Sequence, residues 1–293
     1  MVRAGGHSIW SWIDSETHVA KLPIVTFYSF KGGMGRTTAL DNVGYLLAQQ
    51  GFRVFLWDFD LDAPNLHAHV AAMAGNDAGQ PDIGFGDYLV HWEQTGKPPE
   101  SLSPYLWSFP VGEKGGAVDC FGAGFHGPEY ITKLARIHWE DFYQRGGLDF
   151  LQHLLYEIAT RSPDIVLLDA RTGMTDLAFT AALQLADLTV LLHRLNPDGI
   201  EGIRIAHDLF ARREHPKLSF LYVASMVPLS EFKLATQMKL RAQNLGVRVD
   251  VEIPMEPPLF LLDEIVCPFA TGSSLESAVS NFDESALGTR EAP

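Results

Sequence analysis

The chain has 293 residues, a formal net charge of -14 and 46% hydrophobic residues. This length allows one large α/β domain or two small ones, with enough apolar residues for a sizeable core. Non-specific binding to DNA needs clustered Lys and Arg side chains, so the acidic balance disfavours it and favours a protein partner or a soluble ligand.

The first part of the chain predicts a short N-terminal extension followed by a βαβ unit. We interpret residues 1–22 as an N-terminal extension without chemistry of its own. The apolar segment 23–30 is typical of a buried strand, residues 37–51 have apolar positions at helical spacing, and 53–60 predicts a second buried strand. Strand, glycine-rich loop, helix and strand together predict a parallel sheet with a right-handed crossover.

The middle of the chain, residues 64–160, is less regular, and we interpret it as a variable insertion. Clusters of Gly and Pro interrupt its pattern of apolar residues. Within it we expect a helix around 86–92, a strand at 117–121 and helical structure over 129–160.

The last third of the chain alternates strands and helices. Strands are predicted at 164–170, 187–194, 217–227 and 247–254, and helices at 176–186, 199–213 and 231–246. This alternation predicts a single α/β domain over 23–270, doubly wound, with a mostly parallel sheet flanked by helices. The polar and acidic residues 271–293 are interpreted as a tail.

The segment "YSFKGGMGRTTAL" (28–40) joins the first strand to the first helix and predicts a phosphate-binding loop. Its glycines let the backbone curl so that successive N–H groups point inward, and the helix N-terminus adds a partial positive charge. Thr37 is placed to bind Mg²⁺, whereas Thr38 either caps the helix or touches a phosphate. Arg36 stands where such loops carry Lys, and an additional Lys31 precedes the glycines. The expected nucleotide-binding residues of the loop are Gly32, Gly33, Met34, Gly35, Arg36, Thr37 and Thr38.

Aspartates end the two strands expected beside this loop. Asp58 and Asp60 lie two residues apart at the end of the second strand and therefore share a face, and Asp169 ends the strand "DIVLLD". Ligands of open α/β sheets bind at the carboxyl ends of the strands, where such acids hold Mg²⁺ and orient a water. We expect Asp62 to be a solvated or capping acid.

The loop "KGGMGRTT" resembles the deviant Walker A loop of MinD/ParA-like ATPases, the SIMIBI-class CobQ/CobB/MinD/ParA domains, whose pattern is K-G-G-x-G-K-[ST]-[ST]. The resemblance implies ATP and Mg²⁺ as cofactors, and a homodimer with nucleotide at the interface in which Lys31 reaches the partner's phosphates. It implies that Asp58 lies near Mg²⁺, that Asp60 positions the attacking water and that Asp169 is the Walker B aspartate. Because Arg36 replaces the family's Lys, nucleotide binding is expected and hydrolysis is expected to be slow.

The segment "DARTG" (169–173) stands where MinD-like proteins have a proline-containing turn. Gly173 would bring a backbone N–H to the γ-phosphate of a nucleotide. Arg171 is a candidate catalytic residue, acting as an arginine finger in cis or as a sensor of the γ-phosphate. A salt bridge from Arg171 to a nearby acid is an equally good interpretation.

Two functional classes fit these features. The first is an ATPase whose dimer hydrolyses ATP slowly to reset a protein partner, and the second is a nucleotide-gated interaction module with negligible hydrolysis. A third class, phosphorylation or amidation of a small substrate, would need a substrate pocket within 64–160. Proteins with a K-G-G-x-G-R-T loop resemble accessory ATPases of bacterial multi-gene signalling or defence systems.

Two further motifs are given less weight. The segment "GAGFHG" (122–127) matches G-x-G-x-x-G, but no acid follows at the spacing of a ribose contact, so we interpret it as a mobile loop near the nucleotide. His67 and His69 lack a third ligand in the pattern and are expected at the surface.

The cysteines and the ends of the chain predict a cytoplasmic location. There are two cysteines, Cys120 and Cys267, without a CxxC motif, which is typical of a reducing compartment. No secretory signal or membrane-spanning run is evident. The acidic tail also lacks the basic, amphipathic character of a membrane-surface helix, so no membrane partner is expected.

Overall fold

The computed structural model of the chain describes most of the predicted α/β region. The described residues are 22–74, 81–124, 128–135, 137, 139–211, 218–228 and 230–255. Residues 1–21 and the predicted tail lie outside them, so the boundaries of a domain over 23–270 remain predictions.

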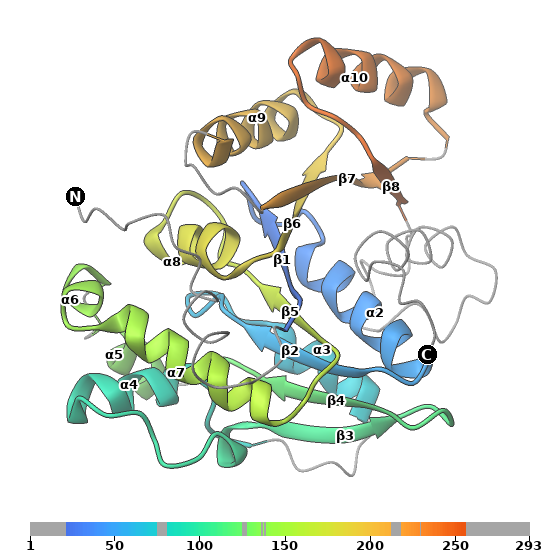
Figure 1. Cartoon of the computed structure of the whole chain (residues 1–293). Helices are drawn as coiled ribbons and strands as arrows, with labels where there is room; N and C mark the ends of the chain where they lie inside the picture. Colours follow the sequence, from blue (N-terminus) through green and yellow to red (C-terminus); the bar gives the residue numbers. More distant parts are fainter. Residues whose placement is uncertain are drawn as a thin grey trace.

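Within the described residues, eight strands form one sheet in the order β3-β4-β2-β5-β1-β6-β7-β8 (Figure 1). β3 pairs with β4 in antiparallel fashion, and all other neighbouring pairs are parallel. The predicted mostly parallel α/β sheet is thus confirmed. The strands are β1 (Ile24–Ser29), β2 (Arg53–Asp58), β3 (Trp107–Val111), β4 (Gly116–Phe121), β5 (Ile165–Asp169), β6 (Leu188–Arg194), β7 (Ser219–Val227) and β8 (Val251–Pro254).

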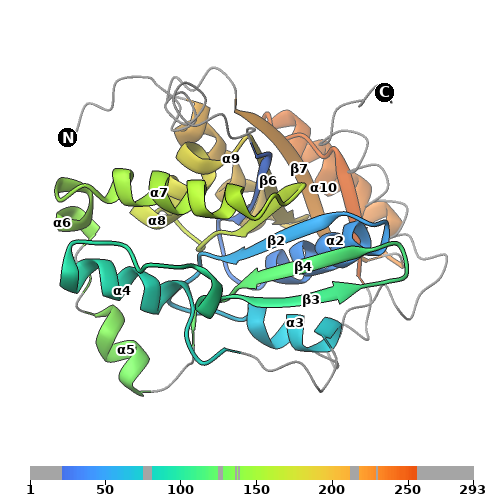
Figure 2. The ribbon, with the colours of Figure 1, turned by 60° about the horizontal axis from the view of Figure 1, so that its bottom comes forward.

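Helices cover both faces of the sheet, as in a doubly wound fold. α2 (Arg36–Gln49) and α3 (Leu66–Ala74) pack on one face, and Figure 2 shows α3 and α7 on opposite sides of β2 and β4. The other face carries α4 (Phe85–Thr95), α5 (Pro128–Leu134), α6 (Trp139–Gln144), α7 (Gly147–Thr160), α8 (Asp176–Phe179), the π-helix η2 (Thr180–Leu185), α9 (Pro197–Ala211) and α10 (Phe232–Asn244). A 3-10 helix, η1 (Ser103–Tyr105), precedes β3. None of the described helices is both long and apolar enough to cross a bilayer.

The central strand β1 is buried on both of its faces. Ile24 and Tyr28 belong to the core beneath α7 to α9, whereas Val25 and Phe27 belong to the core beneath α2. Successive side chains of a strand point to opposite faces, so a strand covered on both sides must be apolar almost throughout. This explains the continuous apolar run that predicted the strand.

The topology brings the predicted site residues to one edge of the sheet. β1 lies between β5 and β6, so the chain crosses over β1 on its way from β5 to β6. In the register of the sheet, Phe27 and Asp58 both pair with Asp169. The carboxyl ends of β1, β2 and β5 therefore meet at a switch point of the topology, where open α/β sheets bind ligands.

The predicted helix 176–186 is α8 followed by the wider π-helix η2. Two buried threonines bond to the backbone of η2. The hydroxyl of Thr26 on β1 donates to the carbonyl of Ala181 at 2.9 Å, and that of Thr189 on β6 donates to the carbonyl of Ala182 at 2.7 Å. These bonds fasten η2 to two central strands.

The elements differ from the predictions in a few places. Residues 129–160 form three separate helices, α5 to α7. The strand expected over 247–254 begins only at Val251. The helix α3 and the edge strand β3 were not predicted.

Candidate phosphate-binding site

The glycine-rich loop curls between β1 and α2 as its sequence predicts. Gly33 and Gly35 adopt left-handed backbone conformations, with φ of 70° and 73°, that other residues rarely adopt. Within the described chain, none of the N–H groups of Gly32 to Gly35 donates a hydrogen bond. Because the loop also lies at the N-terminus of a 14-residue helix, it presents free N–H donors and a partial positive charge to an anion.

Arg36 turns away from the loop and inward, toward the acids at the strand ends. Its Nη2 donates to Oδ2 of Asp60 at 2.7 Å, and its Nε donates to Oδ1 of Asp169. The guanidinium is buried, and its Nη1 has no hydrogen-bond partner within the described chain. Burial opposes the charge of Arg36, but Asp169 and Asp60 outweigh it, so the pKa of Arg36 is raised. Arg36 is therefore the internal counter-ion of two buried carboxylates.

Thr37 and Asp169, both predicted to bind Mg²⁺, lie in direct contact. The hydroxyl of Thr37 donates to Oδ2 of Asp169 at 2.6 Å. Burial raises the pKa of Asp169, and Arg36 and the Thr37 hydroxyl partly offset this effect. Of the two roles considered for Thr38, helix capping does not apply, because the residue at the N-cap is Gly35 and no side chain caps α2.

Asp58 is fully buried and bound by the backbone. Its Oδ1 accepts the N–H of Asp60 at 3.1 Å, and its Oδ2 accepts the N–H of Leu66, the first residue of α3, at 3.3 Å. Burial, reinforced by Asp169 and Asp60, raises the pKa of Asp58 well above its ordinary value. Asp58 thus stabilises the start of α3, in addition to its predicted place near the metal.

The two other cations of the site pair with exposed acids. Nζ of Lys31 lies 3.2 Å from Oδ2 of Asp198, and these side chains are 48% and 79% exposed. Arg171 forms an ion pair with Asp62, which is therefore not merely the solvated or capping acid expected from the sequence. Exposed ion pairs contribute little stability, so both cations are available to a bound anion at small cost.

Gly173 has a positive φ of 77°, and its carbonyl accepts a hydrogen bond from the hydroxyl of Tyr28 at 3.0 Å. The carbonyl is therefore directed toward β1. The role of its N–H toward a γ-phosphate stays a prediction.

The residues present suit a magnesium–nucleotide complex better than a metal held by protein alone. In the described ranges, no group of three or more His, Cys, Asp or Glu side chains is arranged to hold a metal ion. Mg²⁺ usually takes one or two carboxylates and completes its shell with water and substrate phosphates. Thr37 and Asp169 beside the open loop offer this donor set.

His69 corrects the expectation that both histidines lie at the surface. It is buried, with Nδ1 2.5 Å from Oδ2 of the fully buried Asp41 of α2. Its Nε2 lies 2.9 Å from the amide nitrogen of Asn65. The pair joins α2 to α3, a role that the spacing of His67 and His69 does not reveal.

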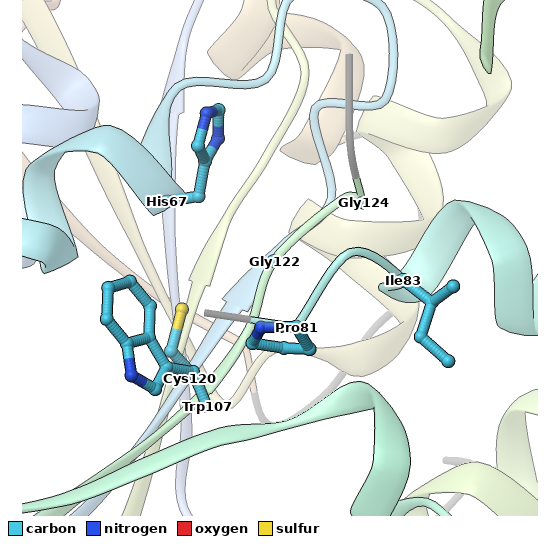
Figure 3. A pocket seen from close by; sticks show the side chains of 7 residues that line it. All are labelled: His67, Pro81, Ile83, Trp107, Cys120, Gly122 and Gly124. Atoms are coloured by element: carbon cyan, nitrogen blue, oxygen red, sulfur yellow. The ribbon is translucent and has the colours of Figure 1, made fainter. Parts of the chain in front are cut away.

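A small cavity lies beside the end of β4 (Figure 3). Its volume is about 20 Å³, enough for about one water molecule. Burial raises the pKa of the Cys120 thiol in its wall, so this thiol is not a reactive nucleophile. The cavity is lined by His67, Pro81, Ile83, Trp107, Cys120, Gly122 and Gly124.

The described part of "GAGFHG" is held by the Phe85 N–H, which donates to the carbonyl of Gly122 at 2.7 Å.

Comparison with known families shows to which family the chain belongs. The model of the CobQ/CobB/MinD/ParA nucleotide binding domain matches residues 25–257. The chain belongs to this family. The match begins at the second residue of β1 and extends beyond β8. It therefore includes the glycine loop and the acids at the strand ends, so the predicted site of this MinD/ParA-family chain lies within the family domain. No curated protein sequence matches the chain.

Solved structures of MinD/ParA-family proteins share this fold. The cell division ATPase MinD of Pyrococcus furiosus has a TM-score of 0.63 at 18% identity, covering 91% of this chain and 100% of that chain. MinD of Pyrococcus horikoshii, solved with Mg-ADP, has a TM-score of 0.64 at 18% identity, with 91% and 98% covered. The MinC:MinD cell division complex of Aquifex aeolicus gives 0.60 at 17% identity, with 92% and 98% covered.

Proposed function

We propose that this protein binds Mg-ATP, hydrolyses it slowly, and acts in the cytoplasm as a nucleotide-dependent dimeric switch on a protein partner. One observation carries the proposal. The glycine loop offers free backbone N–H groups at the start of α2, next to a Thr37–Asp169 contact of 2.6 Å. A polyphosphate and its magnesium ion need these donors and ligands side by side.

Each residue of the site has a place in this function. The loop from Gly32 to Thr38 would bind the phosphates through its backbone N–H groups, because the side chain of Arg36 is directed to Asp60 and Asp169. Thr37, Asp58 and Asp169 would hold Mg²⁺, which neutralises charge on the transferring phosphoryl group. Asp60 orients the attacking water. Gly173 and Arg171 act at the γ-phosphate, with Arg171 released from its exposed pair with Asp62.

The dimer and the partner are inferred from family resemblance. Lys31, which is about half exposed, would leave Asp198 and reach the phosphates bound by a second copy of the chain. MinD of Aquifex aeolicus has been solved in complex with MinC, which supports a switch that acts on another protein. Because proteins with a K-G-G-x-G-R-T loop resemble accessory ATPases of bacterial multi-gene systems, we propose a partner in a bacterial signalling or defence system.

The contact of Arg36 with Asp60 favours a second candidate, a nucleotide-gated interaction module. Asp60 is the residue proposed to orient the attacking water, and its Oδ2 is engaged by the guanidinium at 2.7 Å. If this contact persists with nucleotide bound, ATP would hold a dimer together without being cleaved.

The deciding experiment combines single-turnover ATP hydrolysis with size-exclusion chromatography in ATP and in ADP. The wild type is compared with Arg36→Lys, which restores the family's loop residue and removes the fork that reaches Asp60. The ATPase switch predicts hydrolysis by the wild type and a shift to a dimer in ATP only.

The other outcomes discriminate equally well. A wild type that binds ATP and dimerises without turnover, together with turnover gained in Arg36→Lys, would establish the interaction module. A chain that binds neither ATP nor ADP would refute both candidates.

A further inference from the structure

The carbonyl groups of the glycine loop are held by side chains from outside the loop. Each of three loop carbonyls accepts a hydrogen bond from a residue on a strand. Ser29 Oγ donates to Lys31 O at 2.9 Å, Arg194 Nη2 donates to Gly33 O at 2.8 Å, and Ser225 Oγ donates to Met34 O at 2.7 Å.

The three donors stand on three neighbouring strands. β1, β6 and β7 are adjacent in the sheet, and Arg194 and Ser225 are paired with each other in its register. Ser225 is only 3% exposed, and Nε of Arg194 is buried without a partner among the described groups. These side chains project from strands of the sheet and hold the loop carbonyls by hydrogen bonds, so the sheet determines the shape of the loop.

Met226 supports the same arrangement from β7. It has a positive φ of 54°, at an irregularity of β7 between Ala224 and Val227. Its Sδ lies 3.1 Å from Nη2 of Arg194, and its Cε lies 3.3 Å from the point where a Cβ on Gly35 would stand. A non-glycine residue in this conformation costs energy, so the bend is imposed by its contacts.

Holding the carbonyls determines where the N–H groups point. In a curled loop the carbonyls and the N–H groups face opposite ways, and a phosphate binds only where N–H groups converge. A loop that had to adopt this shape on binding would lose conformational entropy, and inward-facing carbonyls would repel the anion. Tying the carbonyls to strand ends removes both penalties before a ligand arrives.

We propose that Ser29, Arg194 and Ser225 are positioning residues that pre-shape the loop for polyphosphate by holding its carbonyls against the ends of β1, β6 and β7. This inference rests on the proposed nucleotide binding. Its consequence is that Arg194 and Ser225, more than 150 positions from the loop in sequence, help to set the affinity for the phosphates, irrespective of the base.

The test is calorimetric titration with ADP and with inorganic triphosphate, which lacks base and ribose. Ser225→Ala removes one neutral hydrogen bond and is expected to weaken both ligands about fivefold to tenfold. Arg194→Met removes a charged donor and is expected to weaken both by more than about tenfold. Ser225→Thr keeps the hydroxyl on a strand and is expected to restore the affinity.

The matched control is Arg161→Met, which removes the same charge from an ion pair with Asp119 and leaves the loop untouched. It should leave both affinities within about twofold of the wild type, whereas a general charge effect would lower them as Arg194→Met does. Urea unfolding of each ligand-free variant checks that the fold is intact.

Two results would overturn the inference while leaving nucleotide binding in place. The first is unchanged affinity for both ligands in Ser225→Ala and Arg194→Met. The second is weakened ADP with unchanged triphosphate, because these residues would then act on the base or ribose. A wild type that binds neither ligand would instead overturn the proposed function and this inference with it.

Discussion

Nη2 of Arg36 lies 2.7 Å from Oδ2 of Asp60, and both side chains are buried. Arg36 is the residue that departs from the family's loop pattern, and Asp60 is the residue proposed to orient the attacking water. The planar fork of Arg reaches Asp60 and Asp169 at once, which the single ammonium of Lys does less well. One substitution in the loop is thereby coupled to the chemistry at the end of the neighbouring strand.

Removing the charge of Arg36 should destabilise the ligand-free protein. Arg36→Met leaves Asp60 and Asp169 buried without a counter-ion, and breaking a buried pair in this way costs about 3 kcal/mol or more. Arg171→Met breaks an exposed pair and should cost less than about 1 kcal/mol. Urea unfolding measures both, and equal small losses would show that Arg36 does not compensate the acids.

The left-handed conformation of the loop predicts a contrast between neighbouring glycines. Gly33→Ala adds a Cβ at φ of 70°, which should cost about 1 to 2 kcal/mol of stability and weaken nucleotide binding at least tenfold. Gly32 has no positive φ and open space around a Cβ, so Gly32→Ala should leave the stability nearly unchanged. Urea unfolding and ADP titration measure the two effects, and similar losses of stability in both variants would contradict this account.

Arg171 offers a test of catalysis at the γ-phosphate. If it leaves Asp62 for the nucleotide, Arg171→Ala should lower single-turnover hydrolysis at least tenfold with ADP affinity unchanged. Asp62→Asn, which frees Arg171, should not lower the rate. An Arg171→Ala variant with unchanged ATP binding and unchanged turnover would assign Arg171 to the salt bridge alone.

His193 makes the stability depend on pH. Its ring is buried, and burial lowers its pKa to about 4. As the pH falls through about 6.5, the unfolded chain takes up the proton first, so stability is lost between about pH 6.5 and 4.

The size of this effect follows from the two pKa values. Between pH 7.5 and 5, the wild type should lose about 2 kcal/mol more than His193→Leu, which has no proton to bind. Urea unfolding at both pH values measures the difference, in which the titration of other buried groups cancels. Parallel losses in the two proteins would show that His193 titrates normally.

The sequence predicted the parts of the fold and site that depend on local pattern. β1, β2 and β5 are buried on both faces, so each is a continuous apolar run, and their terminal acids meet because parallel strands end at the same edge. The glycine loop could be predicted because Gly33 and Gly35 adopt backbone conformations that other residues avoid.

What the sequence did not reveal depends on distant partners. The start of α3 is fixed by the carboxylate of Asp58, eight positions before Leu66. β3 contains Pro110, which an edge strand tolerates but which masks its strand pattern. The inward turn of Arg36 is decided by two acids, 24 and 133 positions away, and no local rule selects it.

The fastening of η2 by Thr26 and Thr189 also restricts how the site can move. Residues 170–175 connect Asp169, the last residue of β5, to α8, which continues into η2. The helix η2 is hydrogen-bonded to two central strands of the sheet. This connection is therefore short and is joined to the sheet at both ends. A phosphate that bound the N–H of Gly173 would displace this connection against the hydrogen bond from Tyr28 to the Gly173 carbonyl, and Met174, which is 49% exposed, would carry that displacement to the surface of the molecule.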